Sequence, residues 1–254
     1  MEYMSVAEAI ESDGLRIVLV QGMPSPWSQA AKTMMEIKNL EYVTAPLVPG
    51  GTNDEIVAWA GENSAPVVAW NDQKPLTKWN DILFLLERLS PTPRMIPEIA
   101  EDRVIFFGLC HEICGELGIG WNRRLQLFGG AIASGGASDG IKLMAGKYGH
   151  NEADVIAAGK RTAATLDVLA RVLKEQHELG NEFFVGDCVS ALDIYWVAFA
   201  NLLDPLPADK NPMPEEFRPG FVAQDPEIKA AMDPLLFKHR DRIFDQYFRC
   251  PMEY

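Results

Sequence analysis

The segment Arg16-Ile17-Val18-Leu19-Val20-Gln21-Gly22-Met23-Pro24-Ser25-Pro26-Trp27-Ser28 decides the fold of the first third of the chain. Residues 16–20 are a short β-branched apolar run, which predicts a buried strand. Gly22 and Pro24 break this run, and Pro26 suits the first position of a helix. Apolar residues then recur at helical spacing at Trp27, Ala30, Ala31, Met34 and Met35. The segment therefore predicts a strand, a turn and an amphipathic helix.

The next sixty residues continue this alternation. Residues 41–47 and 65–70 have the character of strands, and residues 75–77 form a short extended piece that would pair with the second of them. The sequence Thr52-Asn53-Asp54-Glu55 has the spacing of a capping box and predicts a short helix through Trp59. Apolar residues on one face predict a further helix over residues 79–89. The predicted order, β-α-β-α-β-β-α, is that of an α/β domain.

Helical patterns replace this alternation beyond Ser90-Pro91-Thr92-Pro93, which has the composition of a linker. Residues 190–193 predict the capped start of a helix, and residues 226–248 predict a last helix. Five prolines predict a long irregular loop over residues 204–220. We therefore expect three parts: an α/β domain at residues 1–90, a linker at residues 91–97, and an all-helical domain at residues 98–254.

Composition excludes several classes of function. The chain has 254 residues, of which 48% are hydrophobic, and it carries 23 Lys and Arg against 36 Asp and Glu, a net charge of −13. Such an acidic surface repels nucleic acid and anionic lipid, so we expect neither as a partner. No apolar run reaches the ~18 residues of a membrane span, and the acidic residues 1–14 do not resemble a signal peptide. Four cysteines are too few for a disulfide framework, so we expect a cytoplasmic protein.

Three motifs, in order along the chain, resemble those of the soluble glutathione transferase superfamily. Ser25-Pro26-Trp27-Ser28 matches the active-site turn, and Ala65-Pro66-Val67-Val68 matches the turn with a cis-proline before the third strand. Residues 183–193 match the signature of the helical domain, a Val-Gly-Asp segment followed by a capping box. The resemblance implies a thioredoxin-like domain that binds glutathione, followed by an all-α domain.

The resemblance also implies site residues. Ser25 would donate a hydrogen bond to the glutathione sulfur, with Ser28 as the second candidate. The tripeptide would contact Trp27, Ala65, Pro66, Lys78, Trp79 and Asn80. The chain departs from the family at Lys78-Trp79, where a Glu-Ser pair usually holds the γ-glutamyl group. From local sequence alone, a serine before a helix such as Ser25 is most often an N-cap, and Pro66 could simply start a strand; the resemblance reverses the first of these for Ser25.

By position in the family, helices of the second domain would line a pocket for the electrophile, with Phe107, His111, Trp121 and Arg124 as candidates. Aromatic residues at helical spacing also occur as ordinary core residues. Cys110 and Cys114 lie one helical turn apart, but no second pair of ligands with zinc-like spacing exists. We therefore expect these cysteines to pack as small hydrophobic residues, and we predict no metal site.

These features together predict a glutathione transferase-like enzyme. It would activate the thiol of glutathione, its co-substrate, for attack on a small, mostly apolar electrophile. Conjugation, dehalogenation, ether cleavage and isomerisation all remain open. No cysteine lies near the turn, so chemistry that needs a protein thiol is not expected. Two alternatives remain: a non-catalytic binding or regulatory protein, and an enzyme that places another thiol or a carboxylate in the same groove. The resemblance implies a homodimer.

Overall fold

The computed structural model describes residues 1–254, which divide into two compact units. Unit 1 consists of Met1–Met95, Leu206–Pro214 and Asp245–Tyr254, and unit 2 consists of Ile96–Pro205 and Glu215–Phe244. The first boundary lies inside the segment 91–97 that has linker composition. The sequence placed residues 206–214 and 245–254 in the second domain, whereas the structure packs them with the first. Neither segment carries a periodicity that would have shown this.

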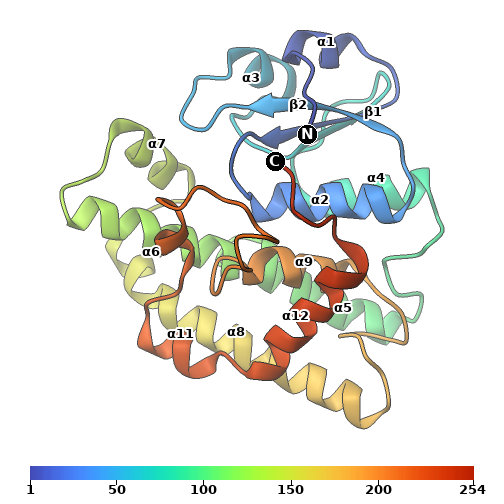
Figure 1. The fold of residues 1–254 in the computed structure, drawn as a ribbon, viewed down its shortest axis with the longest axis vertical. Coiled ribbons are helices and arrows are strands. Elements are labelled where there is room, and N and C mark those ends of the chain that lie inside the picture. The colour runs from blue at the N-terminus through green and yellow to red at the C-terminus, as the bar shows by residue number, and fades with distance from the viewer. The chain divides into compact units, whose positions relative to one another are not determined.

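Unit 1 is built on a three-stranded sheet with the order β2-β1-β3, covered by helices on both faces (Figure 1). Strand β1 pairs in parallel with β2 and antiparallel with β3. Helices α1 and α3 lie on one face of the sheet, and α2 and α4 lie on the other. The elements are α1 (Val6–Glu11), β1 (Leu15–Val20), α2 (Pro26–Ile37), β2 (Tyr42–Leu47), α3 (Asp54–Ala60), β3 (Val67–Trp70) and α4 (Trp79–Leu89). The predicted α/β class of this part is therefore confirmed.

Three details of unit 1 differ from the sequence prediction. Helix α1 was not expected; it is short, and its capping box joins Ser5 to Glu8. Residues 75–77 do not form a strand, because only Leu76 pairs with Val68 as an isolated bridge. Helix α3 begins at Asp54 without a side-chain cap, and Asn53, which precedes it, is left-handed. The predicted capping box at Thr52 is therefore wrong.

A buried lysine ties the ends of α2 and α4 to the segment that leaves unit 1. The Nζ atom of Lys38 lies 2.6 Å from Oε1 of Glu87 and donates to the carbonyl oxygens of Ser90 and Pro93, both at 2.7 Å. The backbone amide of Met95 donates to the same Glu87 carboxylate. Since a buried charge is stable only when paired and hydrogen-bonded, this cluster fixes the path of the chain after α4.

Unit 2 is helical and is organised around α9, whose ten residues are all buried. A helix buried on every side forms the centre of a domain rather than its surface. Helix α5 packs on α9, while α6 packs on α8 and α8 on α11. The helices are α5 (Ala100–Cys114), α6 (Ile119–Ala133), α7 (Asp139–Lys147), α8 (Glu152–Glu178), α9 (Ala191–Ala200), α10 (Arg218–Phe221), α11 (Pro226–Ala231) and α12 (Pro234–Tyr247).

Two expectations for the second half need correction. The single helix predicted over 226–248 is two helices, because Pro234 cannot continue α11 and instead starts α12. The proline-rich loop contains the short helix α10. The stretch Ala100–Ala133, which includes α5 and α6, is long and apolar enough to cross a membrane by length and composition, although no such run was expected. Half of its most apolar window is buried within the fold.

Candidate active site

The turn between β1 and α2 presents a serine whose hydroxyl is not used by the helix. Ser25 occupies the N-cap position of α2 with an extended backbone, and Pro26 follows at the first helical position. The carbonyl of Ser25 accepts the amide of Gln29 at 2.9 Å, which starts the helix. Its side chain forms no capping hydrogen bond. The hydroxyl therefore stands at the positive end of a 12-residue helix, free to donate to a ligand.

The second serine of this turn is less accessible than Ser25, which is 8% exposed. Ser28 is 1% exposed, and its hydroxyl has no hydrogen-bond partner. A buried hydroxyl without access cannot reach a substrate in this conformation, so the geometry favours Ser25 over Ser28. Trp27 is half-buried beside them.

The sheet register brings Ala65 close to this turn. Val18 pairs with Val67 in the antiparallel ladder between β1 and β3. Two residues further along each strand, this register sets Ala65 opposite Val20, the last residue of β1. The Ala65–Pro66 peptide bond is cis, as the sequence resemblance implied. Ala65 is half-buried while Pro66 is buried, so the backbone of Ala65 lies at the edge of the site.

The start of α4 carries an ion pair that the sequence did not reveal. Lys78 is the N-cap residue of α4 and makes no side-chain cap. Its Nζ atom lies 2.9 Å from Oε1 of Glu62, which also accepts the hydroxyl of Thr77 at 3.3 Å. Trp79 and Asn80 form the first turn of α4 and are half-buried. No sequence pattern links positions 62 and 78, because their contact depends on β3 and the turn that follows it.

Within unit 2, two of the four predicted pocket residues meet at a tyrosine. The indole nitrogen of Trp121 donates to the backbone carbonyl of Tyr148 at 3.0 Å, and the two rings meet edge to face at 4.8 Å. Arg124 forms a hydrogen bond with the Tyr148 side chain and lies 5.7 Å from the ring centroid of Phe221. Burial raises the pKa of the Tyr148 hydroxyl, and Arg124 opposes that shift. Tyr148 was not predicted, and its glycine-flanked position offers no signal.

The remaining pocket candidates, Phe107 and His111, both lie on α5 and contact other residues of that helix or its end. The ring of Phe107 packs edge to face on Phe106 at 5.0 Å. His111 is exposed, and its ring lies against the backbone of Gly115, where an added Cβ would come within 2.4 Å of Nδ1.

Arg123, the neighbour of Arg124, has a structural role. It is buried and donates to the Leu202 carbonyl at 2.8 Å and to the Gln126 side chain at 2.6 Å. Burial lowers the pKa of its guanidinium to about 10. The basic pair in the sequence therefore separates into a residue that fixes helices and one, Arg124, that lies beside aromatic rings.

Cys110 and Cys114 are both buried, and burial raises the pKa of each thiol. They pack in the core of unit 2 as the sequence predicted. No group of three or more His, Cys, Asp or Glu side chains gathers in a way that could hold a metal ion.

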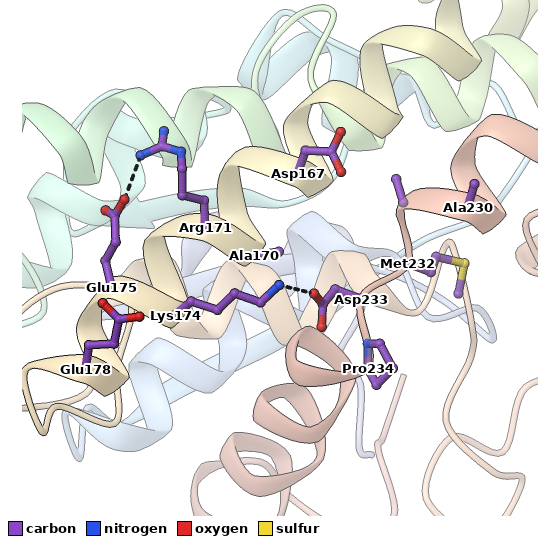
Figure 2. A pocket seen from close by; sticks show the side chains of 11 residues that line it. Asp167, Ala170, Arg171, Lys174, Glu175, Glu178, Ala230, Met232, Asp233 and Pro234 are labelled. Atoms are coloured by element: carbon purple, nitrogen blue, oxygen red, sulfur yellow. Dashed lines mark hydrogen bonds and ion pairs between the residues drawn. The ribbon is translucent and has the colours of Figure 1, made fainter.

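A groove of about 700 Å³ lies between α8 and the α11–α12 turn (Figure 2). Its charged side chains are already paired in part, since Lys174 contacts Asp233 at 2.6 Å and Arg171 contacts Glu175 at 3.1 Å. None of the predicted site residues lines it. The groove therefore does not enlarge the candidate site.

No protein-family model matches the sequence, and no curated protein matches it. Solved structures do match. A glutathione S-transferase from Methylobacterium radiotolerans, in complex with glutathione sulfonate, has 16% identity and a TM-score of 0.62 over 94% of this chain and 97% of its own. A beta-etherase from Sphingobium has 17% identity and a TM-score of 0.57 over 90% and 99%. A bacterial maleyl pyruvate isomerase of the Zeta class has 17% identity and a TM-score of 0.57 over 91% and 92%.

These matches span nearly the whole of both chains, so the likeness includes both units. The chain has the glutathione transferase fold: a thioredoxin-like domain followed by an all-helical domain. The fold class that the three motifs implied is therefore confirmed. At 14–20% identity the likeness establishes architecture alone. The chemistry has to be argued from the site.

Proposed function

We propose that the protein is a glutathione transferase-like enzyme in which Ser25 activates the thiol of glutathione. The observation that carries this proposal is the uncommitted hydroxyl of Ser25 at the N-cap of α2. A serine at this position normally accepts a hydrogen bond from a helix amide with its side-chain oxygen. Here the hydroxyl is left for a ligand, in a fold whose solved members include one bound to glutathione sulfonate.

The chemistry required at Ser25 is stabilisation of a thiolate. A free thiol has a pKa near 8.5, so little of it is ionised at neutral pH. A hydroxyl that donates to the sulfur favours the charged form, and so does the positive end of a helix. Ser25 supplies both at once. The activated sulfur then attacks a small, mostly apolar electrophile, for which we propose the region of Phe107, His111, Trp121 and Arg124.

The Glu62–Lys78 pair gives this chain its own way to hold the other end of glutathione. We propose that the backbone of Ala65 binds the cysteinyl part, with Pro66, Trp27, Trp79 and Asn80 around the tripeptide. The γ-glutamyl group carries an ammonium and a carboxylate. Glu62 and Lys78 offer the complementary charges from an exposed, exchangeable ion pair. Surface pairs of this kind contribute only about 0–1 kcal/mol, so opening one for a ligand costs little.

Two serine variants test the proposal. Ser25→Ala should lower kcat/KM by about 10²-fold, because one charge-assisted hydrogen bond to the thiolate is lost. Ser28→Ala should leave turnover unchanged, since that hydroxyl is buried without a partner. The measurement is the rate of glutathione consumption with a panel of halogenated, ether and double-bond electrophiles. Unchanged turnover in Ser25→Ala would remove the role given to this residue.

The alternative, a non-catalytic binding protein of the same fold, is favoured by the departure at Lys78-Trp79. Immobilised glutathione distinguishes the two. Retention with elution by free glutathione supports the enzyme, while passage of the protein through the column supports the alternative. Calorimetric titration of the wild type with glutathione, and then of Ser25→Ala, separates this enzyme from one that places another thiol or a carboxylate in the groove. We further propose a cytoplasmic location, in keeping with four cysteines that form no disulfide, and a homodimer, as the resemblance implies.

A further inference from the structure

Helix α2 has buried polar residues along the part of the helix that follows Ser25. Five polar residues of this stretch are at most 8% exposed: Ser25, Ser28, Gln29, Lys32 and Thr33. Positions 25, 29 and 32 follow helical spacing, so they lie along one stripe of the helix. A lysine is almost never fully buried unless its charge has a partner. The 1% exposure of Lys32 therefore needs an explanation.

The partner of Lys32 is a backbone carbonyl from the tail segment, defined here as residues 249–254. The Nζ atom of Lys32 donates to the carbonyl oxygen of Glu253 at 2.7 Å, and Nε2 of Gln29 donates to the same oxygen at 3.1 Å. Both nitrogens share one acceptor, so the Lys32 ammonium and the Gln29 amide lie beside the same backbone carbonyl.

The tail segment that supplies this carbonyl is itself fixed within unit 1. The amide of Met252 donates to the carbonyl of Lys210 at 2.8 Å, and the hydroxyl of Tyr254 donates to Asn211 at 3.1 Å. These contacts join the two late segments that the structure assigns to unit 1. They leave the Glu253 carbonyl in one position under α2.

Lys32 belongs to a group of charged side chains that includes Glu36, Arg249 and Glu253. Arg249 pairs with Glu253 at 2.7 Å and with Glu36 at 3.2 Å, and Glu36 accepts the hydroxyl of Tyr42. Arg249 and Lys32 carry two positive charges against the two negative charges of Glu36 and Glu253. Burial lowers the pKa of Lys32, while Glu36 and Glu253 raise it.

We propose that Lys32 is a positioning residue for the sulfur anion at Ser25: held by the Glu253 carbonyl, its buried ammonium adds positive potential at the catalytic end of α2. This inference rests on the proposed function. Lys32 lies seven positions after Ser25, a rise of about 10 Å along the helix. A unit charge at that distance, in a partly buried setting, changes the thiol pKa of bound glutathione by about one pH unit.

Charge variants test the proposal through the thiol rather than through stability. Lys32→Met should raise the thiol pKa of bound glutathione by about one pH unit, and Lys32→Arg should restore it. Glu36→Gln, a milder change in the same charge group, should shift that pKa downward. Lys74→Met is the matched control, because Lys74 belongs to the same unit, is exposed, and forms no hydrogen bond or ion pair. The readout is the ultraviolet absorbance of the thiolate as a function of pH.

The outcomes separate the two proposals. If the wild-type protein binds no glutathione in calorimetry, both the proposed function and this inference fail. If it binds glutathione with a lowered thiol pKa, and Lys32→Met melts earlier but keeps the wild-type pH profile, Lys32 is only structural and this inference alone is overturned. If Lys32→Met does not fold, an unchanged pH profile in Glu36→Gln overturns it equally. Opposite shifts in the two variants would establish it.

Discussion

Gly159 has no side chain, and the carboxylate of Asp225 occupies the space where one would lie. It lies in α8, and a Cβ atom built on it would come within 2.0 Å of Oδ2 of Asp225. Asp225 cannot move away freely. Its Oδ2 accepts the side chain of Gln126 at 2.9 Å, and its Oδ1 accepts the amide of Glu227 at 2.9 Å, which caps α11. The glycine therefore lets α8 and α11 approach while the cap remains formed.

We predict that Gly159→Ala lowers the free energy of unfolding by about 1–3 kcal/mol, because overpacking and a displaced cap outweigh the better helix propensity of alanine. Gly108→Ala in α5 is the control. That position has no atom within 4 Å of a built Cβ, so the propensity gain of about 0.5–1 kcal/mol should appear alone. Denaturant unfolding measures both. Stabilisation of the two variants by the same amount would contradict the packing argument.

At the residue scale, the sequence identified positions better than it identified partners. Ser25 and Ala65 were predicted from their motifs, and the register of β1 with β3 brings both to the same end of the sheet. Glu62 and Tyr148 were missed. Glu62 meets Lys78 only through the turn after β3, and Tyr148 meets Trp121 and Arg124 only through the packing of α7 on α6. Contacts between distant segments leave no local pattern to read.

At the scale of elements, α9 shows how one carboxylate can join several parts of unit 2. Asp193 is fully buried and accepts the amide and the hydroxyl of Ser190 at 2.9 and 2.8 Å. It also accepts the amide of Phe184 at 3.2 Å and lies 2.9 Å from Nε2 of His239 in α12. Arg242 donates to the other ring nitrogen, so Nε2 carries the hydrogen in that arrangement. The predicted capping box is confirmed, and it extends to α12.

We predict that Asp193→Ala destabilises the protein by about 3–5 kcal/mol, because four donors inside the core lose their acceptor. Asp187→Ala removes an exposed carboxylate from the same loop and should change stability by less than about 0.5 kcal/mol. Thermal and denaturant unfolding provide the comparison. A loss of about 1 kcal/mol in Asp193→Ala would mean that the residue acts only as an ordinary helix cap.

Elements with a strong period were predicted well, and the others were not. Helix α4 spans the predicted residues 79–89, and the start of α2 agrees with the pattern of apolar residues. Helix α1 was missed because six residues are too few to establish a period. The prediction of one long final helix was wrong because the apolar pattern continues across Pro234. Where the chain returns to unit 1 depends on single contacts, such as Lys32 with Glu253, that composition does not encode.

At the scale of the whole molecule, net charge and individual carboxylates act in opposite directions as the pH falls. At pH 7 the protein has a net charge of −13, so its acidic side chains repel one another. This repulsion weakens as the pH falls toward the isoelectric point near 4.8. Several carboxylates have pKa values held below their ordinary ones by hydrogen bonds. The Lys174 side chain lowers the pKa of Asp233, and the Arg249 side chain lowers that of Glu253. Asn151 and then Arg161 act likewise on Asp154.

A carboxyl group with a lowered pKa in the folded state stabilises the fold above its unfolded value and loses that contribution as the pH falls through its folded value. The ordinary values are 3.8 for Asp233 and 4.5 for Glu253. We therefore predict that the thermal midpoint stays constant or rises from pH 7 to about pH 5, and falls below about pH 4. Circular dichroism melts across this range measure it. Since both side chains keep part of their surface in water, 0.5 M salt should weaken the acid-side fall. A decline that already begins between pH 7 and 5 would contradict this balance of charges.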